Sequence, residues 1–213
     1  MLRLGEIQRH FNGTVRLYTH YESIVRNPVF TERQKSSEAY RSLETLRYAL
    51  SSQLSISLCA LWDFSTDFES VESYPALLRL AERSDVLEAL RSGALRSGVP
   101  TEPRESLKLA YRLVGKIKRS DRFKSTKNTR DKVFAHKLSQ TRAERRGEEF
   151  DLPQHRDLDL LFVCTLWIQR HIETKLFPRR GHWREPHKDF REETKQMWLS
   201  LNSKLKFRWD AKS

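Results

Sequence analysis

Apolar residues recur every three or four positions along most of this 213-residue chain, and this spacing constrains the fold more than any other feature. A repeat of 3.6 residues places such side chains on one face of an α-helix, whereas a half-buried strand alternates every two residues. Alternating β-branched runs are scarce, so we expect no strand. The chain is therefore predicted to be all-α, an antiparallel helical bundle with appended N- and C-terminal helices.

Local signals set the expected helix ends. Ser84 is expected to cap one helix, and Pro103 suits the first turn of the next, where its missing N–H leaves no bond unmade. Residues 141–153 are polar, charged and contain glycine, which is typical of a loop. The predicted helices span residues 14–25, 32–64, 74–83, 85–95, a segment that begins at 101–103, 120–138, 157–177 and 187–205.

The composition favours one domain over residues 1–213, because 25.3 kDa suits a single core. Cys59 and Cys164 lie in apolar stretches without CxxC spacing, which indicates buried free thiols in a reducing compartment. The longest apolar run, 160–168, is well short of the ~20 residues of a membrane span, and no signal peptide is recognisable. We therefore expect a cytoplasmic protein with no membrane association. Trp62, Trp167 and Trp198 are expected to fill the core.

The positive charge is concentrated in one region. Between residues 104 and 146 there are fifteen Lys or Arg and four Asp or Glu, whereas the net charge of the chain is +12. A basic ridge recurs every fourth residue on the expected outer face of the helix that begins at 101–103, and its members are Arg104, Lys108, Arg112 and Lys116. Like charges at this spacing repel one another. The ridge is therefore either an ordinary solvated face or the binding surface of a polyanion such as RNA.

The segment 130–136, RDKVFAH, brings a fixed cation, a carboxylate and a titratable imidazole within two helical turns. On an α-helix Arg130 and His136 would be about 120° apart in azimuth and ~9 Å apart along the axis, so one copy makes a poor site. Two copies in a symmetric dimer could converge. Histidine suits proton transfer near neutral pH and arginine suits the phosphate, so this set of residues can cleave RNA without a metal.

Arg130-Asp131, followed by four residues and His136 in a late helix of an all-helical chain, resembles the signature of the HEPN superfamily. The likeness is strongest to its abortive-infection branch, bacterial proteins linked to phage defence. We expect residues 32–177 to form a HEPN-like core and residues 178–213 a C-terminal helical extension. The resemblance implies a metal-independent endoribonuclease in which Arg130 and His136 are the catalytic pair, Asp131 orients them and dimerisation builds the site.

The sequence thus predicts a toxin or phage-defence effector that cleaves RNA, acts as a homodimer and uses no metal or cofactor. Lys132 and Lys137 are expected to bind RNA together with the basic ridge. An antitoxin or another protein is a further candidate partner. The alternative function is a non-catalytic helical module that binds RNA or a protein of a defence system. In that case Arg130 and Asp131 pair with neighbouring helices and His136 packs at a helix end.

Overall fold

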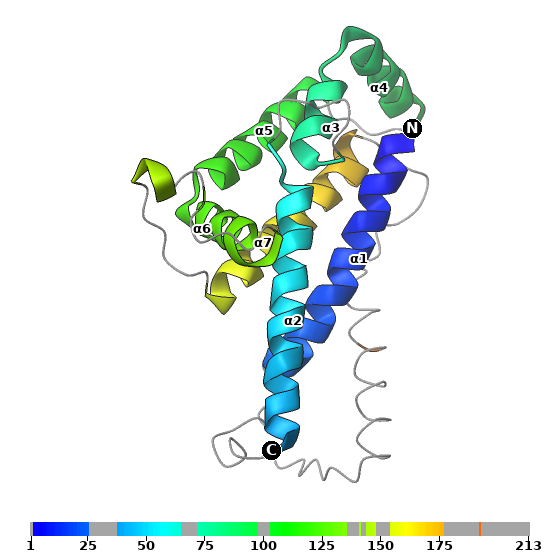
Figure 1. Ribbon diagram of the computed structural model, residues 1–213. Helices are drawn as coiled ribbons and strands as arrows, with labels where there is room; N and C mark the ends of the chain where they lie inside the picture. The colour runs from blue at the N-terminus through cyan, green and yellow to red at the C-terminus, as the bar shows by residue number, and fades with distance from the viewer. Residues whose placement is uncertain are drawn as a thin grey trace. The chain divides into compact units, whose positions relative to one another are not determined.

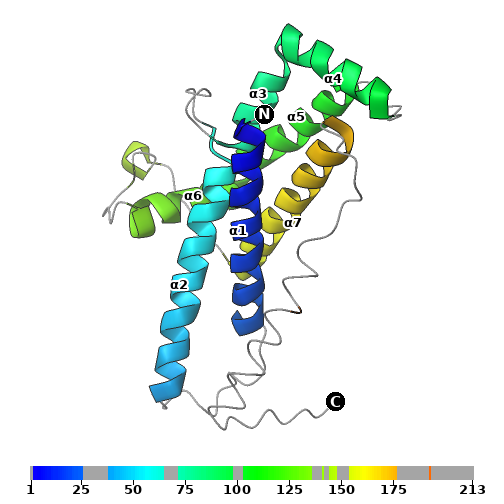
Figure 2. The same ribbon diagram turned by 90° about the vertical axis from the view of Figure 1, so that its right-hand side faces the viewer.

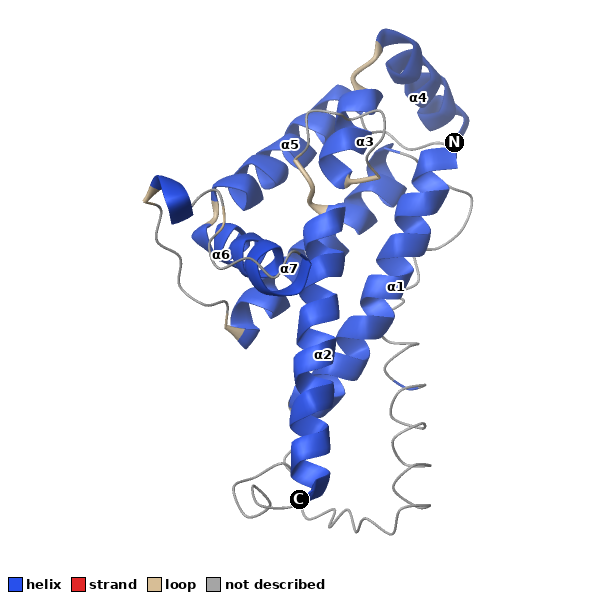
Figure 3. Ribbon diagram, in the orientation of Figure 1, coloured by secondary structure: helices blue, strands red, loops and turns tan. Residues whose placement is uncertain are grey.

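The computed structural model describes residues 2–25, 38–64, 72–97, 103–135, 141, 144–147, 154–176 and 192. Every regular element in these ranges is helical, and they contain no strand (Figure 3). The predicted all-α class is therefore confirmed. The chain divides into two compact units, residues 1–11 with 55–184 and residues 12–54 with 185–213.

The helices are labelled in Figure 1. The α-helices are α1 (Leu2–Val25), α2 (Glu38–Leu61), α3 (Tyr74–Ala81), α4 (Ser84–Ser97), α5 (Pro103–Arg119), α6 (Asp121–Thr129) and α7 (His155–His171). The shorter turns are η3 (Arg130–Ala135), η4 (Glu144–Arg146) and η5 (Ile172–Leu176). The turns η3 and η5 are π-helical, and each directly follows an α-helix.

The predicted start of the first helix at residue 14 is wrong, because α1 begins at Leu2. Leu4, Ile7 and Phe11 extend the three-and-four spacing toward the N-terminus, and all three side chains are buried. Their burial favours the helix although Gly5 and Gly13 lower its intrinsic propensity. Of the predicted helix 187–205, only Glu192 lies within the described residues, and it is helical.

Trp62 lies at the centre of the first unit and is fully buried, as predicted. Its indole N–H donates a hydrogen bond to the Thr165 hydroxyl on α7 at 2.8 Å, and its ring meets that of Tyr74 at 5.3 Å. The amide of Gln169 on α7 donates to that of Gln8 on α1. The core of this unit is therefore assembled from segments that are far apart in the sequence.

The helices α5 and α7 lie side by side in both views (Figures 1 and 2). At one end His171 contacts the Ser106 carbonyl at 2.9 Å, and at the other Arg122 on α6 pairs with Asp157 at 3.3 Å. The earlier residue of α5 and α6, Ser106, contacts the end of α7, and the later one, Arg122, contacts its start. The helices α5 and α6 therefore run antiparallel to α7. Trp167 faces outward from α7 and is 41% exposed, so its predicted place in the core is wrong.

In the second unit, residues 12–25 of α1 bury Val15, Tyr18, Tyr21 and Ile24. The apolar stripe predicted along α2 is unevenly buried, since Leu46 is 40% exposed whereas Leu54, the last α2 residue in this unit, is fully buried. Leu58 and Leu61, which follow in the first unit, are fully buried as well. This agrees with the prediction of a helix that enters the core toward its C-terminal end.

Two expectations about helix starts have different outcomes. Pro103 opens α5, as predicted. The capping role predicted for Ser84 is wrong, because Ser84 is the first residue of α4 and the preceding Arg83 carbonyl accepts from Leu87 N–H at 2.8 Å.

Of the two thiols, Cys59 is buried and Cys164 half-buried. None of the helices in the described ranges combines the length and apolar character that a membrane span requires.

Candidate functional site

The basic ridge predicted on α5 lies on its solvent face. Arg104, Lys108, Arg112 and Lys116 are all exposed. The opposite face holds the buried residues Leu107, Ala110, Val114 and Ile117. Lys108 pairs with Glu105 at 2.5 Å, so part of the positive charge of the ridge is locally compensated. Binding of RNA by this ridge stays a prediction.

The motif segment departs from the single α-helix predicted over residues 120–138. The α-helix α6 ends at Thr129, and the backbone continues as a π-turn from Arg130 to Ala135. In such a turn each N–H bonds to the carbonyl five residues earlier, and π-turns are frequent at functional sites. The azimuth calculated for an ideal α-helix therefore does not apply beyond Arg130.

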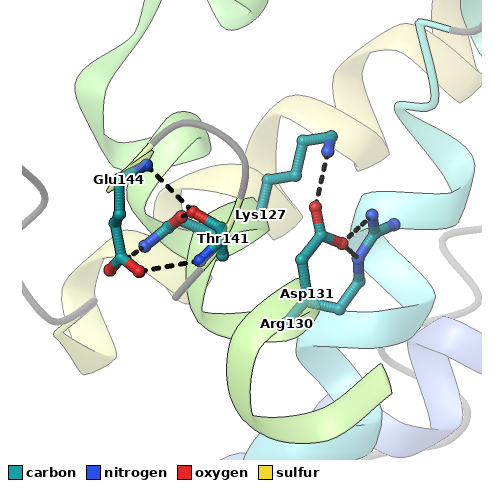
Figure 4. Close-up of polar contacts among 6 residues, drawn as sticks. Lys127, Arg130, Asp131, Thr141 and Glu144 are labelled. Atoms are coloured by element: carbon teal, nitrogen blue, oxygen red, sulfur yellow. Dashed lines mark hydrogen bonds and ion pairs between the residues drawn. The ribbon is translucent and has the colours of Figure 1, made fainter. Parts of the chain in front are cut away.

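Asp131 lies between two cations (Figure 4). Its Oδ1 accepts from Nε of Arg130 at 2.7 Å and also from Nη2 of Arg130. Its Oδ2 accepts from Nζ of Lys127, one α-helical turn earlier, at 2.7 Å. The side chains of Arg130 and Asp131 are 19% and 21% exposed. The carboxylate thus fixes the direction of the guanidinium, which water still reaches in part.

The charge state of Asp131 follows from opposing effects. Partial burial raises the pKa of its carboxyl, but the hydrogen bonds and positive charges of Lys127 and Arg130 together outweigh burial, so the pKa lies below its usual value. Asp131 is therefore ionised at neutral pH. An ionised carboxylate orients an arginine and cannot itself donate a proton.

The charges of Arg130, Asp131 and Lys127 affect the pKa of the Cys59 thiol on α2. Burial raises the pKa of its thiol to about 12, although Arg130 and Lys127 act in the opposite direction. The thiol is protonated at neutral pH, and only a thiolate is a good nucleophile. The buried Cys59 thiol is therefore a poor nucleophile at neutral pH.

A second polar cluster joins Thr141 and Glu144 (Figure 4) to the end of α6 and to the motif turn. The Glu144 carboxylate accepts from the Asn128 amide at 3.0 Å, from Lys132 Nζ at 3.2 Å and from Thr141 N–H at 2.9 Å. The Thr141 hydroxyl donates to the Asn128 amide oxygen and accepts from Glu144 N–H at 3.2 Å. Asn128 and Thr141 are buried. We call these residues the Thr141–Glu144 clamp; it consists of Asn128, Lys132, Thr141 and Glu144.

Sequence reasoning missed this clamp, although its signal is present. Thr141 and Glu144 are three residues apart and exchange hydrogen bonds in the reciprocal pattern of a capping box. The composition of residues 141–153 predicts a loop, and composition does not show the pairing of two side chains. Bonds from the Thr141 N–H, from the Asn128 amide and from Lys132 hold the pKa of the Glu144 carboxyl below its usual value.

The predicted site residues are thus only partly described. Arg130 and Asp131 lie together in the π-turn, and Lys132 lies in the clamp, paired with Glu144. His136 and Lys137 lie outside the described residues. Within the described ranges, no three His, Cys, Asp or Glu side chains are grouped as metal ligands.

The motif turn and the clamp both lie inside the region that a known family covers. The model of the family described as AbiU2, a HEPN family, matches residues 6–197. This match extends beyond the predicted core of residues 32–177 at both ends. No curated protein and no solved structure matches the chain.

Proposed function

Because the chain belongs to the AbiU2 family of HEPN abortive-infection proteins, we propose that it is a metal-independent endoribonuclease. The observation that carries the proposal is the partly exposed guanidinium of Arg130, oriented by Asp131 on a π-turn. A permanently charged, bidentate donor held in one direction suits the phosphate at which negative charge develops during cleavage.

The proposed reaction uses the RNA's own 2′-hydroxyl as the nucleophile. A base removes the hydroxyl proton, and the oxygen attacks the adjacent phosphorus to form a 2′,3′-cyclic phosphate. The bond to the 5′-oxygen breaks, and an acid protonates that oxygen. His136 and the same residue of a second copy would supply the base and the acid, because imidazole exchanges protons near neutral pH.

Asp131 has two opposing effects in this scheme. It holds Arg130 in place, and its negative charge also occupies the guanidinium that a phosphate would bind. Lys127, bound to the other carboxylate oxygen, reduces the net charge of Asp131 that an approaching phosphate meets. A phosphate that binds Arg130 through its remaining N–H groups gains the orientation without displacing the carboxylate.

Dimerisation is part of the proposal. In a homodimer with the two motif turns facing across the two-fold axis, each Arg130 would be supplied with a partner's His136. The mass in solution, measured with and without RNA, tests the dimer.

The decisive experiment incubates purified protein with single-stranded RNA in EDTA. We expect fragments with 2′,3′-cyclic phosphate ends, and we expect Arg130→Ala and His136→Ala each to reduce the rate by at least ~100-fold. Lys124→Ala is the matched control, because Lys124 is an exposed cation of α6 paired only locally with Asp121. Parental cleavage by both site variants would contradict the proposal.

A second candidate function is a non-catalytic RNA-binding module. The exposed ridge on α5 favours this second function, because its cations can bind RNA phosphates independently of Arg130. The same experiment separates the two functions. A protein that binds RNA and leaves it intact under all conditions supports the module.

A further inference from the structure

Three large apolar side chains of α7 face solvent. Leu160, Val163 and Trp167 are 39%, 55% and 41% exposed. Their spacing of three and then four residues places them on one face of the helix, over about 10 Å of its axis. Single exposed apolar residues are common on protein surfaces, whereas a contiguous apolar patch indicates a binding site. The fold itself does not bury this row.

The neighbouring helix α5 continues the apolar surface (Figures 1 and 2). Leu109 is 43% exposed and Leu113 is half-buried. They follow Ser106 by three and seven residues and so lie on the same edge of α5. That edge meets α7, because His171 contacts the Ser106 carbonyl at 2.9 Å and the Trp167 ring stacks on His171 with centroids 5.0 Å apart. We call these apolar residues the α5–α7 face; it consists of Leu109, Leu113, Leu160, Val163 and Trp167.

Exposed cations border this face on both helices. Arg112 and Lys116 lie on α5, each three residues after one of its two leucines, and Arg170 lies on α7, three residues after Trp167. Residues three apart on a helix are neighbours on its surface. Within the described ranges none of these three cations makes an ion pair. The carboxylates of both helices are engaged within the chain: Glu105 with Lys108, Asp157 with Arg122, and Asp159 in a further interaction.

We propose that the α5–α7 face binds an amphipathic helix of a partner protein, with apolar residues along the centre of that helix and carboxylates along its edges. An apolar surface between two helices suits a third helix, whose residues at every third and fourth position would cover it. The carboxylates of the partner would meet the three bordering cations. This inference goes beyond the proposed function, because it requires no cleavage of RNA.

The same observations disfavour two other occupants. A second copy related by a two-fold axis would place the same patch on both sides of the contact, so the bordering cations would meet their own equivalents. Single-stranded RNA binds by stacking its bases on aromatic rings. Four of the five residues of the face are aliphatic, and the ring of Trp167 already stacks on His171 with an interplanar angle of 6°.

The probe is a fluorescein-labelled peptide of about 18 residues, with Leu at every third and fourth position and Glu on both sides of this stripe. Fluorescence anisotropy with the full-length protein measures its affinity. One control peptide has the same composition in shuffled order, and a second has Lys in place of every Glu. We expect saturable binding of the first peptide and binding at least ~10-fold weaker for both controls.

The apolar part of the contact is tested by Val163→Glu. This variant places a carboxylate at the centre of the face, so the affinity for the peptide should fall by at least ~10-fold. Leu46→Glu is the matched control, because Leu46 on α2 is 40% exposed and lies outside the face. It should bind the peptide with the parental affinity. Both variants should keep the parental melting temperature, since each replaces a residue on the surface.

The charged part of the contact is tested by Arg112→Glu and Arg170→Glu. Each should weaken binding several-fold at low salt, and less at high salt, because exposed charges are screened. Arg41→Glu is the matched control, since Arg41 is an exposed arginine of α2. It should change the affinity less than either of the other two variants.

The proposal is overturned if the parent shows no saturable binding at ~1 mM peptide, or if the three peptides bind equally. Parental affinity of Val163→Glu would also overturn it. If the peptide does not bind and Val163→Glu converts a dimer of the parent into a monomer in sedimentation, the face joins two copies of this chain. If the peptide does not bind and Trp167→Ala weakens binding of labelled single-stranded RNA, the face belongs to RNA. Either of these results replaces the partner helix.

Discussion

The two π-turns share a backbone conformation and differ in everything that surrounds it. The turn η5, at the end of α7, buries Ile172 and Leu176 completely and packs against α5. The turn η3, at the end of α6, holds Arg130 and Asp131 in a partly exposed ion pair flanked by Lys127. One turn is thus held by apolar burial and the other by charge.

The difference shows what a π-turn contributes to a site. A π-turn contains about one more residue than an α-helical turn, so it changes the directions in which the following side chains point. In η5 that change delivers two apolar side chains to the core, which stabilises the fold. In η3 it delivers a cation and a carboxylate to a surface that water reaches. The candidate site is therefore defined by its charges and exposure, and the backbone alone does not identify it.

The largest expected effect is on stability and falls on η5. Leu176→Ala should lower the free energy of unfolding by about 2–5 kcal/mol, because it leaves a cavity in a packed interior. Arg130→Ala, in η3, should cost no more than about 1 kcal/mol, since the pair it breaks is partly exposed. Urea unfolding of both variants measures the difference. Equal losses would mean that both turns are structural.

The next effect is on chemistry and falls on η3. Asp131→Asn removes the charge that orients Arg130, so we expect RNA cleavage to fall by about 10- to 100-fold, the equivalent of one charged hydrogen bond. Single-turnover cleavage rates at fixed pH measure it. Asp121→Asn serves as the control, because Asp121 is paired with Lys124 on the same helix and lies on the surface. Faster cleavage by Asp131→Asn would mean that the carboxylate competes with the phosphate.

A smaller effect is expected for Glu173, one of the polar residues of η5. Glu173 accepts a hydrogen bond from the Gln169 amide at 2.6 Å, and Glu173→Gln keeps an acceptor while removing the charge. The free energy of unfolding should fall by about 0.5–1.5 kcal/mol, and cleavage should keep the parental rate. Thermal unfolding and the cleavage assay together measure this. A cleavage defect without a loss of stability would join η5 to the site.

The smallest effect is a shift in titration. The pKa of Glu144 is lowered in the folded protein, so the clamp's contribution to stability is present above the ordinary value of 4.5 and is lost as pH falls through the lower folded value. Carbon-detected NMR of the Glu144 carboxyl should show a midpoint below 4.5. With Thr141→Val the midpoint should move toward 4.5. A parental midpoint at or above that value would contradict the clamp.

Periodicity was sufficient for much of the fold and for part of the site. The faces of α5 and the core position of Trp62 follow from apolar spacing, because each helix buries one stripe. Spacing could not reveal the π-turn, since its winding depends on contacts made after folding. The prediction for Trp167 is wrong because aromatic character alone does not determine which face of a helix a residue occupies. Thr141 and Glu144 have the Thr-x-x-Glu spacing of a capping box, which the sequence shows but the polar composition of the segment does not distinguish from a loop.

The hydrogen bond between Gln8 and Gln169 joins residues 161 positions apart. A ribosome that adds about 5–20 residues per second needs roughly 10 to 30 s to make the second of them after the first. During that interval Gln8 lacks its hydrogen-bond partner on α7. This contact therefore forms only late in synthesis, after an interval longer than the microseconds to seconds in which small domains fold.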